Sequence, residues 1–169
     1  VDYCDERSLP LWLVSEQRSR FNYHFNDRVP VVMAEIHTEI PERCDLHTML
    51  QEPVVKAVMF LTAQEVREGP LSFMPHARST QWFIHGQDII PAEGGKLPAM
   101  RFMAEANGWT PDELMAFGDS ENDNEMLRYA GTGVAMGNAL EETKAASDYV
   151  TDDCDDEGVA HALAHFALI

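Results

Sequence analysis

Two different hydrophobic patterns alternate through the second half of the chain. Residues 97–107 place apolar side chains at positions 97, 100, 103 and 104, which is the spacing of one helix face. Residues 114–117 and 134–136 are short, continuously apolar runs, as expected of strands buried on both faces. The pattern also predicts a strand at 149–150 and helices at 122–129, 138–147 and 158–168. This alternation indicates an α/β fold with a parallel, doubly wound sheet.

The first half of the chain has a different pattern. It predicts one helix, at 62–68, and strands at 29–36, 54–61, 81–84 and 88–90, with a break at Gly86. These elements suit a small α+β layer with one sheet. Turn residues cluster at 91–95. We therefore predict two domains, an α+β domain over residues 1–92 and an α/β domain over residues 93–169.

Composition narrows the classes of function. The chain has 29 acidic and 12 basic residues and a formal net charge of −17. Such a charge repels phosphate backbones and anionic membrane surfaces, so we expect neither a nucleic-acid nor a membrane partner. It attracts cations, including divalent metal ions. Hydrophobic residues make up 45% of the chain, which is enough for a sizeable core.

The cysteines and the N-terminus bear on the compartment. The three cysteines, at positions 4, 44 and 154, are widely spaced and form no C-x-x-C motif. This usage is typical of a reducing compartment, and we expect a cytoplasmic protein. The acidic N-terminus carries no signal peptide, and it lacks an initiator Met, which suggests a processed or truncated chain.

The densest group of chemically competent residues is the segment 117–123, Phe-Gly-Asp-Ser-Glu-Asn-Asp. It follows a predicted buried strand and opens a helix, so Asp119 and Asp123 fall at the carboxyl end of a parallel strand, where such sheets bind ligands. Two carboxylates and an amide suit Mg²⁺. A purely structural role, in which these acids cap and solvate the helix, is equally open. Lys96 follows Gly94-Gly95 just before a helix and could reach an anion or a carboxylate there.

The sequence does not match other known binding motifs, because the required residues do not occur at the required spacing. The glycines at 131 and 133 are not followed by a third at 136, so the dinucleotide-binding fingerprint is absent. An EF-hand counted from Asp119 lacks its glycine and its final glutamate. His161 and His165 share a helix face, but no third metal ligand is evident. The acidic run 152–157 is best explained as a solvated loop and helix start.

Several ordered blocks of sequence resemble a known superfamily. These are 118–127 (GDSENDNEML), 130–139 (AGTGVAMGNA), 144–151 (KAASDYVT) and 157–160 (EGVA), together with Lys96. They are similar to the haloacid-dehalogenase superfamily and, within it, to the Cof-type phosphatases. The match covers residues 93–169 well. Residues 1–92 match only in position and outline, as the α+β cap inserted into the Rossmann-like core of these enzymes.

The resemblance implies a Mg²⁺-dependent phosphomonoester hydrolase that acts on a small phosphorylated metabolite, such as a sugar phosphate, through an aspartyl-phosphate. Carried over by position, Asp119 is the Mg²⁺ ligand, and Asp123 supports the water shell of the metal or orients Lys96. Lys96 holds the nucleophile and the phosphoryl oxygens, and Asn122 contacts the substrate phosphate. The resemblance also implies that the cap, residues 1–92, selects the substrate.

One departure from the superfamily pattern limits this interpretation. The nucleophile motif D-x-D-G-T/V does not occur, and its nearest match, Asp153-Cys154-Asp155, lies in the acidic loop. We therefore expect a fragment that contains the cap and the C-terminal half of the core and is inactive alone. Its bare apolar edges would associate with the missing segment or with another copy of the chain. The alternatives are a degenerate regulatory or interaction module and a phosphomutase; the compact 119–123 spacing disfavours the phosphomutase.

Overall fold

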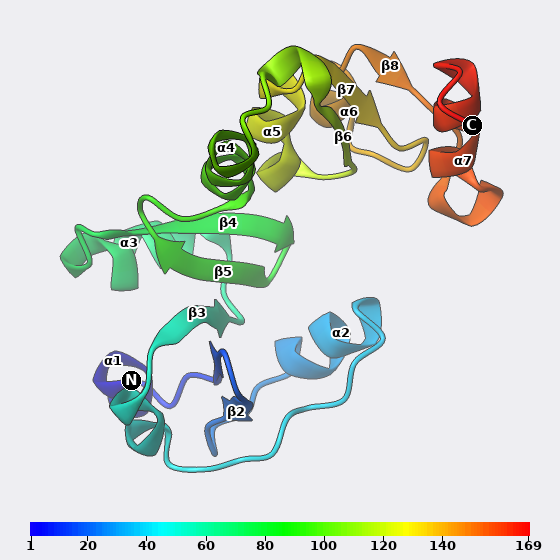
Figure 1. The fold of residues 1–169 in the computed structure, drawn as a ribbon. Helices are drawn as coiled ribbons and strands as arrows, with labels where there is room; N and C mark the ends of the chain where they lie inside the picture. The colour runs from blue at the N-terminus through cyan, green and yellow to red at the C-terminus, as the bar shows by residue number, and fades with distance from the viewer. The chain divides into compact units, whose positions relative to one another are not determined.

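An antiparallel sheet and a parallel sheet occupy separate parts of the chain in the computed structural model, which describes all 169 residues. The chain divides into two compact units, Val1–Glu93 and Gly94–Ile169. Figure 1 shows the first unit in blue to green and the second in green to red. No helix in the chain has the length and apolar character needed to span a membrane.

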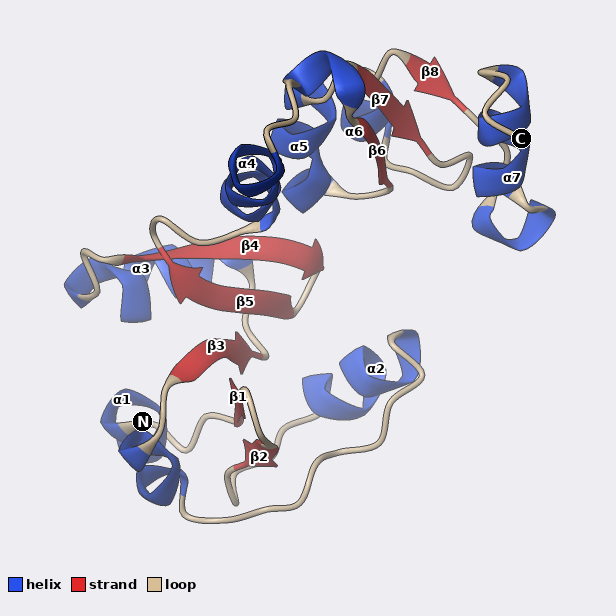
Figure 2. Ribbon diagram, in the orientation of Figure 1, coloured by secondary structure: helices blue, strands red, loops and turns tan.

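The first unit is built on a five-stranded antiparallel sheet in the order β2-β1-β3-β5-β4 (Figure 2). Its strands are β1 (Leu11–Ser15), β2 (Ser19–Phe21), β3 (Val54–Met59), β4 (Ala77–Phe83) and β5 (Gly86–Pro91). The predictions of strands near 54–61, 81–84 and 88–90 are confirmed. Strands β1 and β2 were not predicted, although Leu11, Leu13 and Ser15 alternate as buried positions.

Both faces of this sheet are covered. One face packs against α1 (Asp2–Glu6), α3 (Ala63–Glu68) and two 3₁₀ helices, η1 (Leu46–Gln51) and η2 (Pro70–Phe73). The other face packs against α2 (Arg28–Glu35) through the buried rings of Phe21 and Phe60. Figure 1 shows α1 and α2 on opposite sides of the sheet. Helix α3 confirms the predicted helix at 62–68, and Thr62 caps it in a capping box with Glu65.

The prediction of a strand at 29–36 is wrong, because this segment is helix α2. Its run of valines favours a strand by propensity. However, Val29, Val32 and Met33 are the buried positions, which is the three- and four-residue spacing of a helix face. Pro30 falls in the first turn, where no intrahelical N–H bond is needed. Packing against the sheet therefore outweighs the local preference of the valines.

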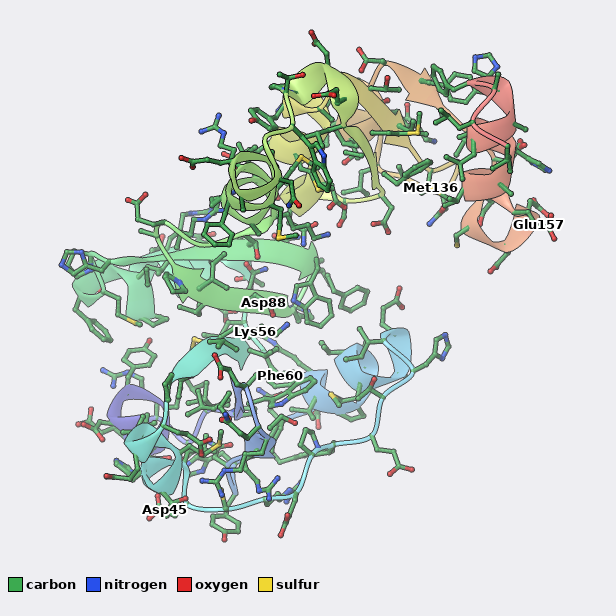
Figure 3. All side chains as sticks on the ribbon, in the orientation of Figure 1. Asp45, Lys56, Phe60, Asp88, Met136 and Glu157 are labelled. Carbon is green, nitrogen blue, oxygen red and sulfur yellow. The ribbon has the colours of Figure 1, made fainter.

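An ion pair lies on the second face of the antiparallel sheet. Lys56 Nζ on β3 is 2.9 Å from Asp88 Oδ2 on β5, and Trp82 Nε1 donates to Asp88 Oδ1 at 3.0 Å. Figure 3 labels Lys56 and Asp88 together with Phe60. The pair connects neighbouring strands diagonally, since Asp88 lies opposite Val58 in the register.

The second unit is an α/β layer on a parallel sheet in the order β6-β7-β8. The strands are β6 (Met115–Gly118), β7 (Thr132–Ala135) and β8 (Tyr149–Val150). The helices are α4 (Lys96–Asn107), α5 (Asn124–Tyr129), α6 (Glu141–Lys144) and α7 (Gly158–His165), with 3₁₀ turns η3 (Pro111–Glu113), η4 (Glu121–Asp123) and η5 (Cys154–Asp156). The predicted α/β fold class, with a parallel sheet in the second unit and an α+β arrangement in the first, is confirmed.

The helices and strands of the second unit lie close to their predicted positions, except that one helix begins later than predicted. Helix α4 and strands β6, β7 and β8 fall where they were predicted. Asn138 was predicted to cap a helix running to residue 147, but α6 begins after Leu140. The Asn138 side chain instead accepts a hydrogen bond from the backbone N–H of Cys154 at 3.3 Å. It therefore joins two loops and caps no helix.

Candidate functional site

Asp123 is the buried centre of the predicted site. It ends the η4 turn that follows β6, and only 2% of its side chain is exposed. Its Oδ2 accepts hydrogen bonds from the backbone N–H groups of Asp119 at 3.2 Å and Ser120 at 3.4 Å. An ionised carboxylate at such a depth requires partners of this kind, because burying an unpaired charge is costly. The turn after β6 supplies two of them from its own backbone.

Lys96 supplies the third partner of Asp123. Its Nζ lies 2.5 Å from Asp123 Oδ1, and 48% of the Lys96 side chain is exposed. Lys96 is the first residue of α4, and Gly95 before it has φ of 125°, a left-handed conformation that favours glycine. This backbone geometry brings the lysine to the end of β6. One side of the ammonium is held by a buried carboxylate, and the other side faces outward.

Asp119 differs from Asp123 in every respect that matters for metal binding. It lies directly after β6, it is exposed, and its carboxylate makes no hydrogen bond or ion pair. Its backbone is fixed at both ends: the N–H donates to Asp123 Oδ2 and the carbonyl accepts from Leu140 N–H at 3.0 Å. The free carboxylate therefore stands on a rigid support at the carboxyl end of a parallel strand.

Asn122 and Ser120 complete the turn. Ser120 Oγ donates to Asn122 Oδ1 at 2.8 Å, and Ser120 forms a capping box with Asp123. The bond to Ser120 fixes the amide of Asn122, whose nitrogen has no partner in the structure. The free N–H₂ group of Asn122 and the ammonium of Lys96 are hydrogen-bond donors of the kind that bind an oxyanion.

The donor set fits a hard divalent cation. Mg²⁺ is held in proteins by one or two carboxylates and keeps several waters. Asp119 offers one free carboxylate for this purpose, whereas both oxygens of Asp123 are already engaged. The assignment of both aspartates as metal ligands stays a prediction. The contacts of Asp123 favour the role of orienting Lys96.

Two groups named in the sequence do not join this arrangement. The oxygens of Asp153 and Asp155 and the sulfur of Cys154 lie within 4.8 Å of one another in the η5 loop. There Asp153 caps the turn and accepts a hydrogen bond from the Cys154 thiol, which raises the pKa of that thiol and makes this cysteine a poor nucleophile. His161 pairs with Asp152 at 2.8 Å, while the ring of His165 stacks on Tyr149 at 4.3 Å. The two histidines have separate partners.

Two positions of the site were missed by the sequence analysis. A Cβ at Gly118 would collide with the Asp123 side chain, so glycine is what lets the carboxylate lie against the end of β6. Ser120 holds Asn122 and accepts from the N3 backbone of the turn. The spacing Ser120-x-x-Asp123 is a capping-box signal and could have indicated the second of these.

Comparison with known proteins assigns the family. The chain matches the haloacid dehalogenase-like hydrolases over residues 1–163. It belongs to this family. The resemblance read from the sequence blocks is thereby confirmed.

Relatives and solved structures agree with this assignment. The putative phosphatase YkrA of Bacillus subtilis is 29% identical over 98% of this chain and 63% of its own length. A phosphoglycolate phosphatase of Methanothermobacter thermautotrophicus is 33% identical over 85% of this chain and 67% of its own. The structure of the HAD subclass IIB sugar phosphatase BT4131 matches with a TM-score of 0.85 and 29% identity, over 99% of this chain and 64% of that one.

The chain spans 63% of the length of YkrA and 64% of BT4131. The relatives therefore contain segments that have no counterpart in these 169 residues.

Proposed function

We propose that this chain is part of a Mg²⁺-dependent phosphomonoester hydrolase that acts on a small phosphorylated metabolite, such as a sugar phosphate. The observation that carries the proposal is the arrangement after β6: the buried carboxylate of Asp123 binds both Lys96 and the backbone N–H of Asp119, whose own carboxylate is free. The names of the relatives, which include sugar and phosphoglycolate phosphatases, support the reaction class.

Each residue then has a defined role. Asp119 binds the Mg²⁺ ion, which when present neutralises negative charge on the phosphoryl oxygens. Lys96 directs its outward-facing N–H groups at the same oxygens, and Asp123 keeps the ammonium in place. Asn122 donates its free amide N–H to the phosphate. These groups stabilise charge that is spread over the equatorial oxygens during phosphoryl transfer.

The nucleophile has to come from elsewhere in the proposal. A carboxylate that attacks phosphorus and forms an aspartyl-phosphate divides one difficult step into two. No D-x-D-G motif occurs among residues 1–169, so we place this carboxylate outside them. Residues 1–92 are proposed to determine which metabolite is accepted. The three unpaired cysteines fit a reducing compartment, and we propose a cytoplasmic location.

Phosphate release tests the proposal. A polypeptide that supplies a D-x-D-G segment before Val1 should release phosphate from a panel of sugar phosphates in the presence of Mg²⁺, and the chain alone should not. Asp119→Asn and Lys96→Met should each lower kcat/KM by at least about a hundredfold. Asp112→Asn, an exposed aspartate in η3, is the matched control and should have no effect.

Three outcomes would contradict the proposal. Asp119-dependent hydrolysis by the chain alone would show that the nucleophile lies within it. Inactivity of the longer polypeptide towards every phosphate ester tested would favour a non-enzymatic module. Transfer of phosphate within a sugar, without release, would favour a phosphomutase.

A further inference from the structure

One histidine of the first unit has a carboxylate at each of its two ring nitrogens. His47 Nε2 lies 2.8 Å from Asp2 Oδ1, and His47 Nδ1 lies 2.9 Å from Asp45 Oδ1. Asp2 belongs to α1, whereas Asp45 caps η1, the element that carries His47. The ring therefore joins α1 to η1, across 45 positions of sequence. None of these residues takes part in the site after β6.

Only the charged form of the imidazole satisfies both contacts. An ionised carboxylate can only accept hydrogen bonds, and a neutral imidazole has a single N–H group. In either neutral tautomer, one nitrogen lone pair would face a carboxylate oxygen at 2.8 or 2.9 Å. The imidazolium donates to both. Its bonds to Asp2 and then to Asp45 raise the pKa of His47 above the ordinary value of 6.5.

The other titratable groups around the ring also favour its charged form. Asp5, the second acid of α1, places its Oδ2 3.9 Å from His47 Nδ1, and its Oδ1 lies 3.2 Å from His24 Nε2 in the loop after β2. The α-ammonium of Val1 acts on Asp2 as an additional positive charge. Tyr23 and the half-buried Cys44 line the same hollow. Three carboxylates thus face one imidazole.

The two contacts of His47 differ in what holds them together. Asp45 is two residues away in the same turn, and its Oδ1 also accepts the backbone N–H of His47 at 3.0 Å. The contact with Asp2 joins separate elements, so it lasts only while α1 stays in place. Keeping two distant segments together costs more chain entropy than closing a short turn. When one proton is lost, the other should remain on Nδ1, and Nε2 then turns a lone pair towards Asp2.

We propose that His47 is a pH-sensitive link between α1 and η1, in which the charged ring ties Asp2 to Asp45 and deprotonation releases the Asp2 side. The residue that this link protects is Cys4 on α1, which is 3% exposed and packs with Leu11 and Leu13 in the core of the unit. Release of α1 exposes Cys4 to solvent. The inference is independent of the proposed phosphatase activity.

The direction of the pH dependence follows from the groups involved. Because the folded pKa of His47 is raised, the link is fully present below pH 6.5 and is lost as the pH rises through the folded value. At the acid end, the pKa values of Asp2 and Asp45 are both lowered from 3.8, so the two carboxylates remain ionised down to about that pH. The groups are solvent-exposed, so we expect effects of a few-fold.

Nitrogen NMR of the imidazoles in the full chain tests the protonation of His47. The ring should titrate above pH 6.5, and the Nδ1–H tautomer should predominate beyond its midpoint. Asp2→Asn should lower this midpoint, whereas His161→Gln in the second unit should leave it unchanged. A midpoint at or below 6.5, the same midpoint in Asp2→Asn, or an Nε2–H tautomer at high pH would overturn the proposal.

Alkylation of Cys4 by N-ethylmaleimide, followed by peptide mass spectrometry, measures the release of α1. At about pH 6, His47→Gln and Asp2→Asn should each react at Cys4 about two- to tenfold faster than the original protein. Near pH 8.5 the ratio should approach one, because the link is then open in the original as well. Comparison at one pH cancels the change in thiolate fraction. The double variant should react no faster than either single variant, since both remove the same contact.

The second unit provides matched controls. His161→Gln removes an exposed imidazole that has one carboxylate contact, with Asp152 at 2.8 Å, and it should not change the rate at Cys4. The rate at the exposed Cys154 should be equal in all variants. The proposal is overturned by equal Cys4 rates at pH 6, by a ratio that does not change with pH, or by the same acceleration in His161→Gln. Circular dichroism establishes that each variant is folded before its rates are compared.

Discussion

Lys96 and Asp123 are 27 positions apart in the sequence, and their side chains meet at 2.5 Å at the end of β6. The carboxylate is buried and the ammonium is half exposed. The pair therefore joins the start of α4 to the turn after β6, the same turn that carries the free carboxylate of Asp119.

The first prediction concerns the stability that this pair provides. Lys96→Met leaves a buried carboxylate with only its backbone donors, and it should lower the free energy of unfolding by about 1–3 kcal/mol. Urea denaturation measures the change. The double variant with Asp123→Asn should recover part of the loss, because the uncompensated charge is removed. Lys144→Met, which breaks a pair with the 91% exposed Glu141, is the control and should cost less than about 0.5 kcal/mol.

The second prediction separates the two aspartates. Asp119→Asn should leave the unfolding free energy within about 0.5 kcal/mol of the original, because its carboxylate has no partner to lose. Asp123→Asn should destabilise the protein at neutral pH, since Lys96 and two backbone N–H groups lose an ionised acceptor. Denaturation curves of the two variants and the original protein, measured side by side, test this difference in stability. Equal losses in the two variants would contradict the roles assigned here.

The third prediction concerns the stability of the folded protein in acid, to which the carboxylate of Glu65 contributes. Hydrogen bonding from the Arg28 guanidinium, at 2.6 and 3.1 Å, and from Thr62 lowers the pKa of Glu65 from 4.5 to about 2. Since the folded pKa lies below the unfolded one, the stabilisation is fully present above about pH 4.5 and is lost as the pH falls towards 2.

The Glu65→Gln variant tests this sign. It should be about 1 kcal/mol less stable than the original protein near pH 7, because it weakens a helix cap and removes an ion pair. The difference between the two proteins should shrink steadily below pH 4.5. Denaturation measured across this range checks the prediction. A difference that stays constant with pH would contradict the charge-based account.

The fourth prediction addresses how α2 is held. Phe60 is fully buried, and its ring centroid is 5.4 Å from that of Phe21 in the cluster that receives α2. Phe60→Ala should cost about 3–5 kcal/mol of unfolding free energy. Ile84→Ala, which truncates a side chain that is 60% exposed, should cost far less. Hydrogen exchange should show faster exchange in α2 for the Phe60 variant.

The fifth prediction concerns association. The second unit exposes Leu140, Val150, Leu168 and Ile169 by 43–76%, and β6 pairs with a neighbour on one side only. Exposed apolar side chains and open strand edges favour pairing with another chain. The 169-residue chain should therefore self-associate, with a mass by light scattering that rises with concentration. A single species of 19.0 kDa at all concentrations would contradict this expectation.

Local pattern was sufficient for much of the second unit. The helix at 97–107 followed from apolar spacing, and β6 and β7 from short apolar runs. The place of the segment 118–123, between a buried strand and a helix, followed from the patterns on either side of it. These features are predictable because each depends on neighbours within a few residues, such as capping groups and a buried strand.

Tertiary structure decided the rest. The segment 29–36 is a helix because its buried positions face the sheet, which outweighs the strand preference of its valines. Local pattern also placed Asp119 and Asp123 at the same end of a strand. It did not show which of the two carboxylates is free of partners. That depends on Lys96, which the fold of α4 brings to Asp123. Likewise Asp5 of α1 pairs with His24 at 3.2 Å and with His47 at 3.9 Å only in the folded protein, since contacts over such separations depend on packing and not on sequence spacing.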